Sequence, residues 1–165
     1  MSDGEKNLIN ALKAAIGKDY ILTDQESLSF YSMDVYRSKE TPIAIIQPGS
    51  LEELQEAVRI STGLDIAVIT RGGGASYTDA YLPSTSKSLV IDTSRLNKII
   101  EINEEDMFIT VEPGVTWAEM ATALSEKNLR TPFWGPFSGL KATVGGSTSQ
   151  NSVSMGTSRY GGSPE

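Results

Sequence analysis

Apolar residues recur at helical spacing in three segments of the chain, and this pattern predicts three amphipathic helices. The first covers 5–16. The other two begin after Ser50 and Thr116, each of which precedes a glutamate by three residues, the spacing of a capping box. We expect these two helices to end at Gly63 and at about Asn128. The side chains expected to face inward are Leu8, Ile9, Leu12, Ala15, Ile16, Leu51, Leu54, Ala57, Val58, Trp117, Met120, Ala121 and Leu124.

Five short runs rich in β-branched and apolar residues predict strands. The first two are expected to be buried, and with the helix between them they have the length of a βαβ unit, so they should be parallel with a right-handed crossover. The last two flank Glu104–Asp106 and predict an antiparallel hairpin. The five predicted strands are 42–47, 65–70, 88–93, 98–103 and 107–112.

The arrangement of these elements predicts an α+β fold of two lobes. Residues 1–40 contribute the first helix and a connecting segment without clear periodicity. Residues 41–87 form a first lobe with a small parallel sheet flanked by helices. Residues 88–165 form a second, mainly antiparallel and incomplete lobe. The boundary is placed near residue 88, where the predicted sheet changes from parallel to antiparallel.

Composition narrows the classes of function. The chain is 39% hydrophobic and 21% charged, which is typical of a globular protein rather than a disordered one. Its net charge of −7 and the lack of a Lys/Arg-rich run argue against binding along a nucleic-acid backbone. No apolar run reaches the length of about 18–20 residues needed to span a bilayer.

The chain contains no cysteine and no histidine. Disulfides and thiolate metal sites are therefore excluded, and zinc chemistry and Ser-His-Asp hydrolysis are close to excluded. No metal site is expected. The lack of cysteine suits a reducing cytoplasm. If this chain takes part in chemistry, a bound organic cofactor is expected to supply the reactivity.

A triple-glycine loop directly follows the second predicted strand, in the run Thr70-Arg71-Gly72-Gly73-Gly74-Ala75-Ser76-Tyr77. Successive glycines let several N–H groups point into one concavity, and such a nest binds phosphate oxygens. The loop is neither a Walker A motif nor a Rossmann fingerprint, because no Gly-Lys-Ser/Thr follows and Tyr77 stands where a third glycine belongs. A flexible surface turn is the alternative.

A second segment, 135–151, combines the Gly145-Gly146 pair with many small hydroxyl residues. These residues suit close packing against a flat, polar, extended ligand. The alternative is a Gly/Ser-rich linker, although Leu140, Ala142 and Val144 count against it.

The ordered set of these motifs resembles the FAD-binding domain of the vanillyl-alcohol oxidase / p-cresol methylhydroxylase superfamily, and most closely its glycolate oxidase subunit and D-lactate dehydrogenase type. The resemblance covers residues 42–161. It rests on the strand ending at Pro48, the capped helix and the second strand, followed by Arg71-Gly72-Gly73-Gly74-Ala75-Ser76, Asp92-Thr93-Ser94-Arg95-Leu96-Asn97, Val111-Glu112-Pro113-Gly114-Val115-Thr116, Ala142-Thr143-Val144-Gly145-Gly146 and Arg159-Tyr160-Gly161.

The resemblance implies that FAD lies in a cleft between the two lobes. The first loop would hold the FAD pyrophosphate through backbone N–H groups, and the second segment would lie beside the flavin and pyrophosphate. The residues expected to bind the cofactor are Arg71, Gly72, Gly73, Gly74, Ala75, Ser76, Pro136, Ser138, Thr143, Val144, Gly145, Gly146, Ser149 and Asn151. No catalytic residue is implied.

The chain departs from the family pattern in three ways. Ala75 and the lack of histidine and cysteine imply non-covalent FAD, since family members with covalent flavin often use a histidine in the first loop or a cysteine later. The loop continues with Tyr77-Thr78-Asp79-Ala80-Tyr81, where the family usually has small residues and glycine. The sequence stops at Glu165, before the strands that complete the second lobe and before a substrate-binding domain.

The function implied is the FAD-binding portion of an oxidoreductase that oxidises a small 2-hydroxy acid or alcohol by hydride transfer to flavin. The alternative is a non-catalytic fragment or binding module, including one half of a split flavoenzyme. The expected partners are FAD, a missing substrate-binding domain or partner chain, and a second copy of the chain, because an incomplete sheet exposes an edge.

Several residues keep two interpretations. Arg71 either contacts a phosphate or pairs with an acidic neighbour. Glu104–Asp106 is expected to be a solvated turn rather than a metal site, and Trp117 a core residue. Trp134 is a candidate neighbour of the flavin. The aromatic residues expected to serve packing rather than a ligand pocket are Tyr20, Phe30, Tyr31 and Tyr36.

Overall fold

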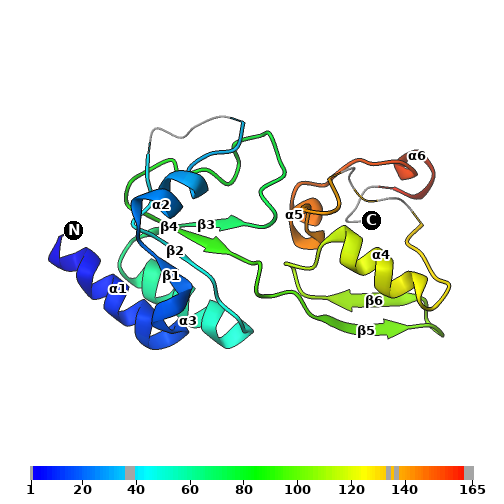
Figure 1. Cartoon of the computed structure of the whole chain (residues 1–165), viewed down its shortest axis with the longest axis horizontal. Coiled ribbons are helices and arrows are strands. Elements are labelled where there is room, and N and C mark those ends of the chain that lie inside the picture. The colour runs from blue at the N-terminus through cyan, green and yellow to red at the C-terminus, as the bar shows by residue number, and fades with distance from the viewer. Residues whose placement is uncertain (1, 36–39, 133–134, 136–137, 162–165) are drawn as a thin grey trace. The chain divides into compact units, whose positions relative to one another are not determined.

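The computed structural model describes residues 2–35, 40–132, 135 and 138–161 (Figure 1). The chain divides into two compact units. The first comprises Met1–Arg71 and Ser76–Arg95, and the second comprises Gly72–Ala75 and Leu96–Glu165. The triple-glycine loop therefore belongs to the second unit, although the residues on both sides of it belong to the first.

The first unit is built on a four-stranded sheet in the order β1-β2-β4-β3. These strands are β1 (Ile21–Leu22), β2 (Ala44–Ile46), β3 (Ala67–Arg71) and β4 (Ser88–Asp92). β4 pairs in parallel with both β2 and β3, and β1 pairs antiparallel with β2. The carboxyl ends of β2, β3 and β4 therefore point the same way, which is the end where open α/β sheets bind ligands.

Two helices cover one face of this sheet. α1 (Asp3–Ile16) and α3 (Leu51–Gly63) pack against each other, and Figure 1 shows them side by side. Alternate residues of β2 and β4 point toward these helices, because side chains alternate between the two faces of a strand. They form one hydrophobic core with the apolar faces of the helices. This core contains Leu8, Ile9, Leu12, Ile16, Ile21, Ala44, Ile46, Ala57, Ile66, Leu89 and Ile91.

The segment interpreted as connecting structure contains three short elements: η1 (Lys18–Tyr20), β1 and α2 (Gln25–Tyr31). α2 begins at Asp24, whose carboxylate accepts a hydrogen bond from the Ser27 N–H at 2.8 Å. Aspartate is a favoured N-cap, so a local signal for this helix was present in the sequence. Tyr36 lies outside the described residues.

The expected lobe boundary at residue 88 is wrong for β4. This strand lies at the centre of the first unit's sheet, between β2 and β3, and the first unit continues to Arg95. β2 and β3 are parallel as predicted, but they are not neighbours. A strand from later in the chain has inserted between them, and the periodicity of a βαβ segment cannot reveal such an insertion.

β3 is also less buried than its apolar sequence predicted. It forms one edge of the sheet, where Ala67 and Thr70 are exposed and Val68 and Ile69 are half-buried. Arg71 is the only residue of the strand that is buried. The strand therefore ends on an enclosed charged side chain immediately before the glycine loop.

The second unit contains the predicted hairpin of β5 (Ile99–Asn103) and β6 (Phe108–Val111), with an irregularity between Ile99 and Glu101. Helix α4 (Trp117–Ser125) follows, and α5 (Val144–Ser149) and α6 (Thr157–Tyr160) are short helices that the sequence pattern did not predict. The core of this unit contains Val115, Trp117, Met120, Leu124 and Ala142.

The helix starts match the predicted caps with one difference. Thr116 and Glu119 form a complete capping box. The Ser50 hydroxyl accepts a hydrogen bond from the Glu53 N–H, but the Glu53 carboxylate accepts one from the Gly49 N–H at 2.7 Å rather than from Ser50. Two residues expected to face inward, Leu51 and Ala121, are exposed. No helix in the described part of the chain is both long enough and apolar enough to cross a bilayer.

Candidate functional site

The triple-glycine loop packs tightly against the segment 141–143 of the same unit. A Cβ atom on Gly73 would overlap the Lys141 carbonyl oxygen, and one on Gly72 would overlap the Thr143 hydroxyl. A side chain at either position is therefore incompatible with this packing. Gly74 is required for a different reason, since its φ of 64° lies in the left-handed region that favours glycine.

Three amides of this loop have no hydrogen-bond acceptor within the described residues. They belong to Gly72, Gly73 and Ala75. Gly72 and Ala75 are half-buried, whereas Gly73 is exposed. Because the protein does not use these N–H groups, they are available as donors to an acceptor from outside the protein. Successive N–H groups of this kind form an anion site without a charged side chain.

The second glycine segment differs, because the protein itself uses its amides. Val144 N–H donates to the Val115 carbonyl at 2.8 Å, and Gly145 N–H donates to the Pro113 carbonyl at 3.1 Å. Gly146 N–H donates to the hydroxyl of Thr143, the N-cap of α5, at 3.2 Å. These three amides are therefore not available to a phosphate.

The hydroxyl groups of α5 are also engaged within the protein. Ser147 accepts a hydrogen bond from the Trp117 indole N–H at 2.8 Å, and both side chains are buried. Thr148 and Ser149 donate to the carbonyls of Val144 and Gly145 at 3.0 Å and 2.8 Å. Trp117 is therefore a core residue, as predicted, and its indole also anchors α5.

Other predicted contacts in this segment are exposed or lie outside the described residues. Ser138 and Asn151 are exposed, and the Ser138 carbonyl accepts the N–H groups of both Lys141 and Ala142 at 2.8 Å. This turn sets the position of the backbone that faces Gly73. Trp134 and Pro136 are outside the described residues.

The Arg71 guanidinium is enclosed at the carboxyl end of β3. It is 6% exposed and donates from Nη1 to the carbonyls of Tyr31 and Met33, at 3.2 Å each. Its central carbon lies 4.7 Å from the ring centroid of Tyr81, 5.1 Å from that of Tyr31 and 5.4 Å from that of Phe30. Within the described residues it forms no ion pair with a carboxylate, and its contact with a phosphate stays a prediction.

The neighbouring strand ends in a second buried charge, Asp92, which lies opposite Arg71 in the sheet register. Its carboxylate accepts hydrogen bonds from the Tyr31 hydroxyl at 2.5 Å, from the Gln47 amide at 2.8 Å and from the Ser94 N–H at 2.9 Å. Burial raises the pKa of the Tyr31 phenol, and the hydrogen bond to the carboxylate raises it further. Tyr31 therefore keeps its proton and remains a donor to Asp92.

The exit of the glycine loop is held by Tyr81. Its ring is buried, and its hydroxyl donates to the Ser76 carbonyl at 2.9 Å. Burial raises the pKa of Tyr81, with Arg71 opposing the shift. The unusual aromatic continuation of the loop thus includes a residue that contacts both Arg71 and Ser76.

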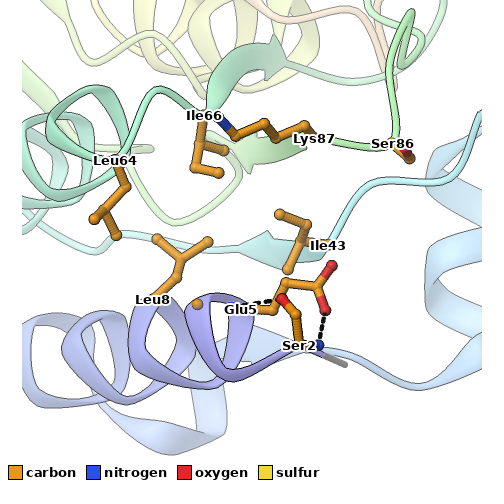
Figure 2. A pocket seen from close by; sticks show the side chains of 9 residues that line it. Ser2, Glu5, Leu8, Ile43, Leu64, Ile66, Ser86 and Lys87 are labelled. Atoms are coloured by element: carbon orange, nitrogen blue, oxygen red, sulfur yellow. Dashed lines mark hydrogen bonds between the residues drawn. The ribbon is translucent and has the colours of Figure 1, made fainter.

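A separate cavity of about 330 Å³ lies at the amino ends of β2, β3 and β4, where Ile43, Ile66 and Lys87 precede the strands (Figure 2). Leu8 and Leu64 add to its apolar lining. Among its polar residues, Lys87 pairs with Asp65 at 2.9 Å and Ser2 with Glu5 in the α1 capping box. None of the predicted site residues lines this cavity.

The structure brings Gly72, Gly73, Gly74 and Ala75 together with Thr143 in the second unit, and it places Arg71 and Ser76 in the first unit. Three further residues at this edge of the sheet were not among the predicted site residues: Gln47, Asp92 and Tyr81. One signal could have found the first two, because both follow or end predicted strands at the carboxyl edge of a parallel sheet.

Comparison with known proteins identifies the family of this chain. A family model described as an FAD binding domain matches residues 42–165. D-2-hydroxyglutarate dehydrogenase of Stutzerimonas stutzeri (strain A1501) is 29% identical over 155 residues, which are 93% of this chain and 33% of that protein. Glycolate oxidase subunit GlcD of Bacillus subtilis (strain 168) is 31% identical over 132 residues, which are 79% of this chain and 28% of that protein.

A solved structure of p-cresol methylhydroxylase with substrate bound matches with a TM-score of 0.80 at 27% identity, covering 93% of this chain and 31% of that one. The chain has the FAD-binding fold predicted from its motifs. It belongs to the FAD binding domain family, and it spans about a third of the length of the curated relatives it matches.

Proposed function

We propose that this chain binds FAD non-covalently through the loop Gly72–Ala75 and is the cofactor-binding portion of a flavin-dependent oxidoreductase. The observation that carries the proposal is the group of three amides, of Gly72, Gly73 and Ala75, that have no acceptor among the described residues in a loop locked against Lys141–Thr143. A diphosphate offers several acceptor oxygens at the spacing of successive amides.

The two glycine segments take different roles in this proposal. In the first segment, the N–H groups of Gly72, Gly73 and Ala75 hold the diphosphate, together with Gly74 and Ser76. The second supplies the surface against which the loop is ordered, and its Thr143 hydroxyl borders Gly72. Val144, Gly145 and Gly146 contribute shape rather than donors, because their N–H groups are used internally. Ser138, Ser149, Asn151 and Pro136 remain predicted neighbours of the cofactor.

Bound FAD supplies a hydride acceptor, and the protein supplies its binding and orientation. Two of the relatives are named for glycolate and D-2-hydroxyglutarate, which are 2-hydroxy acids. A small 2-hydroxy acid or alcohol is therefore the proposed substrate class of the whole enzyme. The non-covalent mode follows from Ala75 and from a sequence without histidine or cysteine.

Competition between flavin derivatives tests the role of the loop. FAD is titrated into the purified 165-residue chain and followed by flavin fluorescence anisotropy, then displaced with ADP, FMN or riboflavin. If the amides hold the diphosphate, ADP displaces FAD while riboflavin does not. Failure of FAD to bind, or equal affinity for FAD and riboflavin, contradicts the proposal.

The second candidate is a fragment or one half of a split flavoenzyme, and the coverage of about a third of each relative favours it over a self-sufficient enzyme. Dye reduction is measured with D-2-hydroxy acids, first with the FAD-loaded chain alone and then with a candidate partner chain added. Activity only in the mixture supports the split enzyme. Activity of the chain alone contradicts it.

Three further predictions belong with this proposal. A substrate-binding domain or partner chain is expected to complete the site. The alternative is a homodimer of this chain. Sedimentation of the purified chain distinguishes a dimer from a monomer. A cytoplasmic location stays a prediction that cell fractionation tests.

A further inference from the structure

Two features of the first unit meet at the ends of the glycine loop. Arg71 is the residue immediately before Gly72–Ala75, and Ser76 is the residue immediately after it. Tyr81 connects the two, because its ring lies 4.7 Å from the Arg71 guanidinium carbon and its hydroxyl donates to the Ser76 carbonyl at 2.9 Å. A cation–π contact and one hydrogen bond thus join the entry of the loop to its exit.

The entry side is fixed further by the surrounding sheet. The Arg71 carbonyl accepts a hydrogen bond from the Thr93 N–H at 3.0 Å, and its guanidinium donates to the carbonyls of Tyr31 and Met33. Tyr31 in turn donates to buried Asp92. Each of these contacts lies within the first unit, so they do not depend on any ligand or on the second unit.

The surroundings of Arg71 also fix the position of its side chain. The guanidinium is 6% exposed, lies over three rings and donates from Nη1 to two protein carbonyls.

We propose that Arg71 and Tyr81 are positioning residues that form a clamp across the glycine loop: they hold Arg71 and Ser76 at a fixed separation, so that the intervening amides are arranged for an anion before it arrives. This inference rests on the proposed FAD-binding role of the loop. Pre-organisation increases affinity because less ordering remains to be done on binding. Tyr81 lies in the segment Tyr77–Tyr81, which directly follows Ser76.

The clamp is tested with Tyr81→Phe, Tyr81→Leu and Arg71→Lys, and with Tyr77→Phe as a matched control. Tyr77 lies in the same loop and is 70% exposed. The first readout is the ¹⁵N order parameter of the backbone N–H groups of 72–76 in FAD-free protein. The second is the FAD dissociation constant. The third is Tm, which reports loss of packing alone.

Tyr81→Leu is expected to lower the loop order parameters from the rigid range of about 0.85 to below about 0.6, and to weaken FAD binding about tenfold, the factor for a lost hydrogen bond together with a lost cation–π contact. Tyr81→Phe keeps the ring and loses only the hydroxyl, so a weakening of about threefold is expected. Arg71→Lys keeps the charge but loses the planar stacking surface, so the loop is expected to loosen partially. Tyr77→Phe should leave both readouts unchanged.

The clamp is overturned if Tyr81→Leu lowers Tm while the order parameters and the FAD dissociation constant stay at wild-type values, since Tyr81 would then serve packing only. If Tyr81→Leu does not fold, unchanged loop order in both Tyr81→Phe and Arg71→Lys overturns it equally. Failure of the wild-type chain to bind FAD would sink the proposed function, whereas loosening of the loop in the variants would still establish the clamp.

Discussion

The two glycine segments have similar composition, yet they use their backbones in opposite ways. In the first, the N–H groups of Gly72, Gly73 and Ala75 have no acceptor among the described residues, and Gly72 and Gly73 are required by close packing. In the second, the N–H groups of Gly145 and Gly146 are both satisfied, by a carbonyl and by a helix-capping hydroxyl. Close approach also explains Gly145, whose Cβ atom would lie 2.6 Å from the Pro113 side chain.

Glycine content alone therefore does not show whether the backbone N–H groups of a segment are available to a ligand. Glycine permits close backbone approach in both segments, and what differs is whether the approaching backbone uses up the amides. The Lys141 carbonyl and the Thr143 hydroxyl pack against the first loop without accepting hydrogen bonds from its N–H groups. In the second segment, the N–H groups themselves donate hydrogen bonds to the neighbouring residues.

Gly73→Ala is expected to have the largest effect on this contrast. The added Cβ would overlap the backbone carbonyl of Lys141, which cannot rotate away as a side chain could. We expect a loss of about 3 kcal/mol in unfolding free energy and a loss of FAD binding of about a hundredfold. Urea denaturation and FAD titration measure the two effects. Gly63→Ala is the matched control, because nothing lies within 4 Å of its Cβ position; an equal effect of both substitutions would refute the packing argument.

Gly145→Ala is expected to separate stability from cofactor binding. Its Cβ would meet the Pro113 side chain and carbonyl at 2.6 Å and 2.8 Å, so a cost of about 2 kcal/mol is expected. Because the Gly145 amide already has an acceptor, FAD affinity measured well below Tm should change less than about threefold. Loss of FAD binding in a protein that remains folded would show that this segment contacts the cofactor directly.

Gly74→Ala and Gly146→Ala compare one glycine from each segment. Gly74 has a φ of 64°, so an alanine there costs about 1 kcal/mol of backbone strain and should weaken FAD binding about fivefold. Gly146 lies inside α5 with no such strain, and its Cβ position is 3.1 Å from the Thr143 hydroxyl. We expect a stability change within about 0.5 kcal/mol there and unchanged FAD affinity. Isothermal titration of both variants with FAD measures the two affinities. A larger loss of FAD affinity in Gly146→Ala than in Gly74→Ala would contradict the proposed contrast between the segments.

The smallest expected effect is a pH dependence of stability that arises from Tyr31, near the entry of the first loop. The pKa of Tyr31 is raised in the folded protein by burial and by its hydrogen bond to Asp92. The stability this provides is fully present below the unfolded pKa of about 10 and is lost as pH rises through the folded pKa. Urea midpoints between about pH 8 and pH 11 should fall more steeply for the native chain than for Tyr31→Phe. Equal slopes would show that Tyr31 titrates normally.

The sequence alone determined the features that depend on neighbouring residues. The capping box at Thr116, the hairpin around Glu104–Asp106 and the apolar face of α1 follow from short-range spacing, and each is present in the structure. The FAD-binding family could also be recognised from the chain, because its motifs occur in order along it. The matched family model covers residues 42–165.

The tertiary structure decided everything that depends on contacts between distant segments. β4 lies between β2 and β3, and Arg71 is enclosed by rings from residues 30, 31 and 81. The most important of these outcomes concerns hydrogen bonding, since the N–H groups of the two glycine segments differ in which acceptors reach them. A local pattern specifies that an N–H group exists and can be approached, but its acceptor is set by the packing of chain segments far apart in sequence.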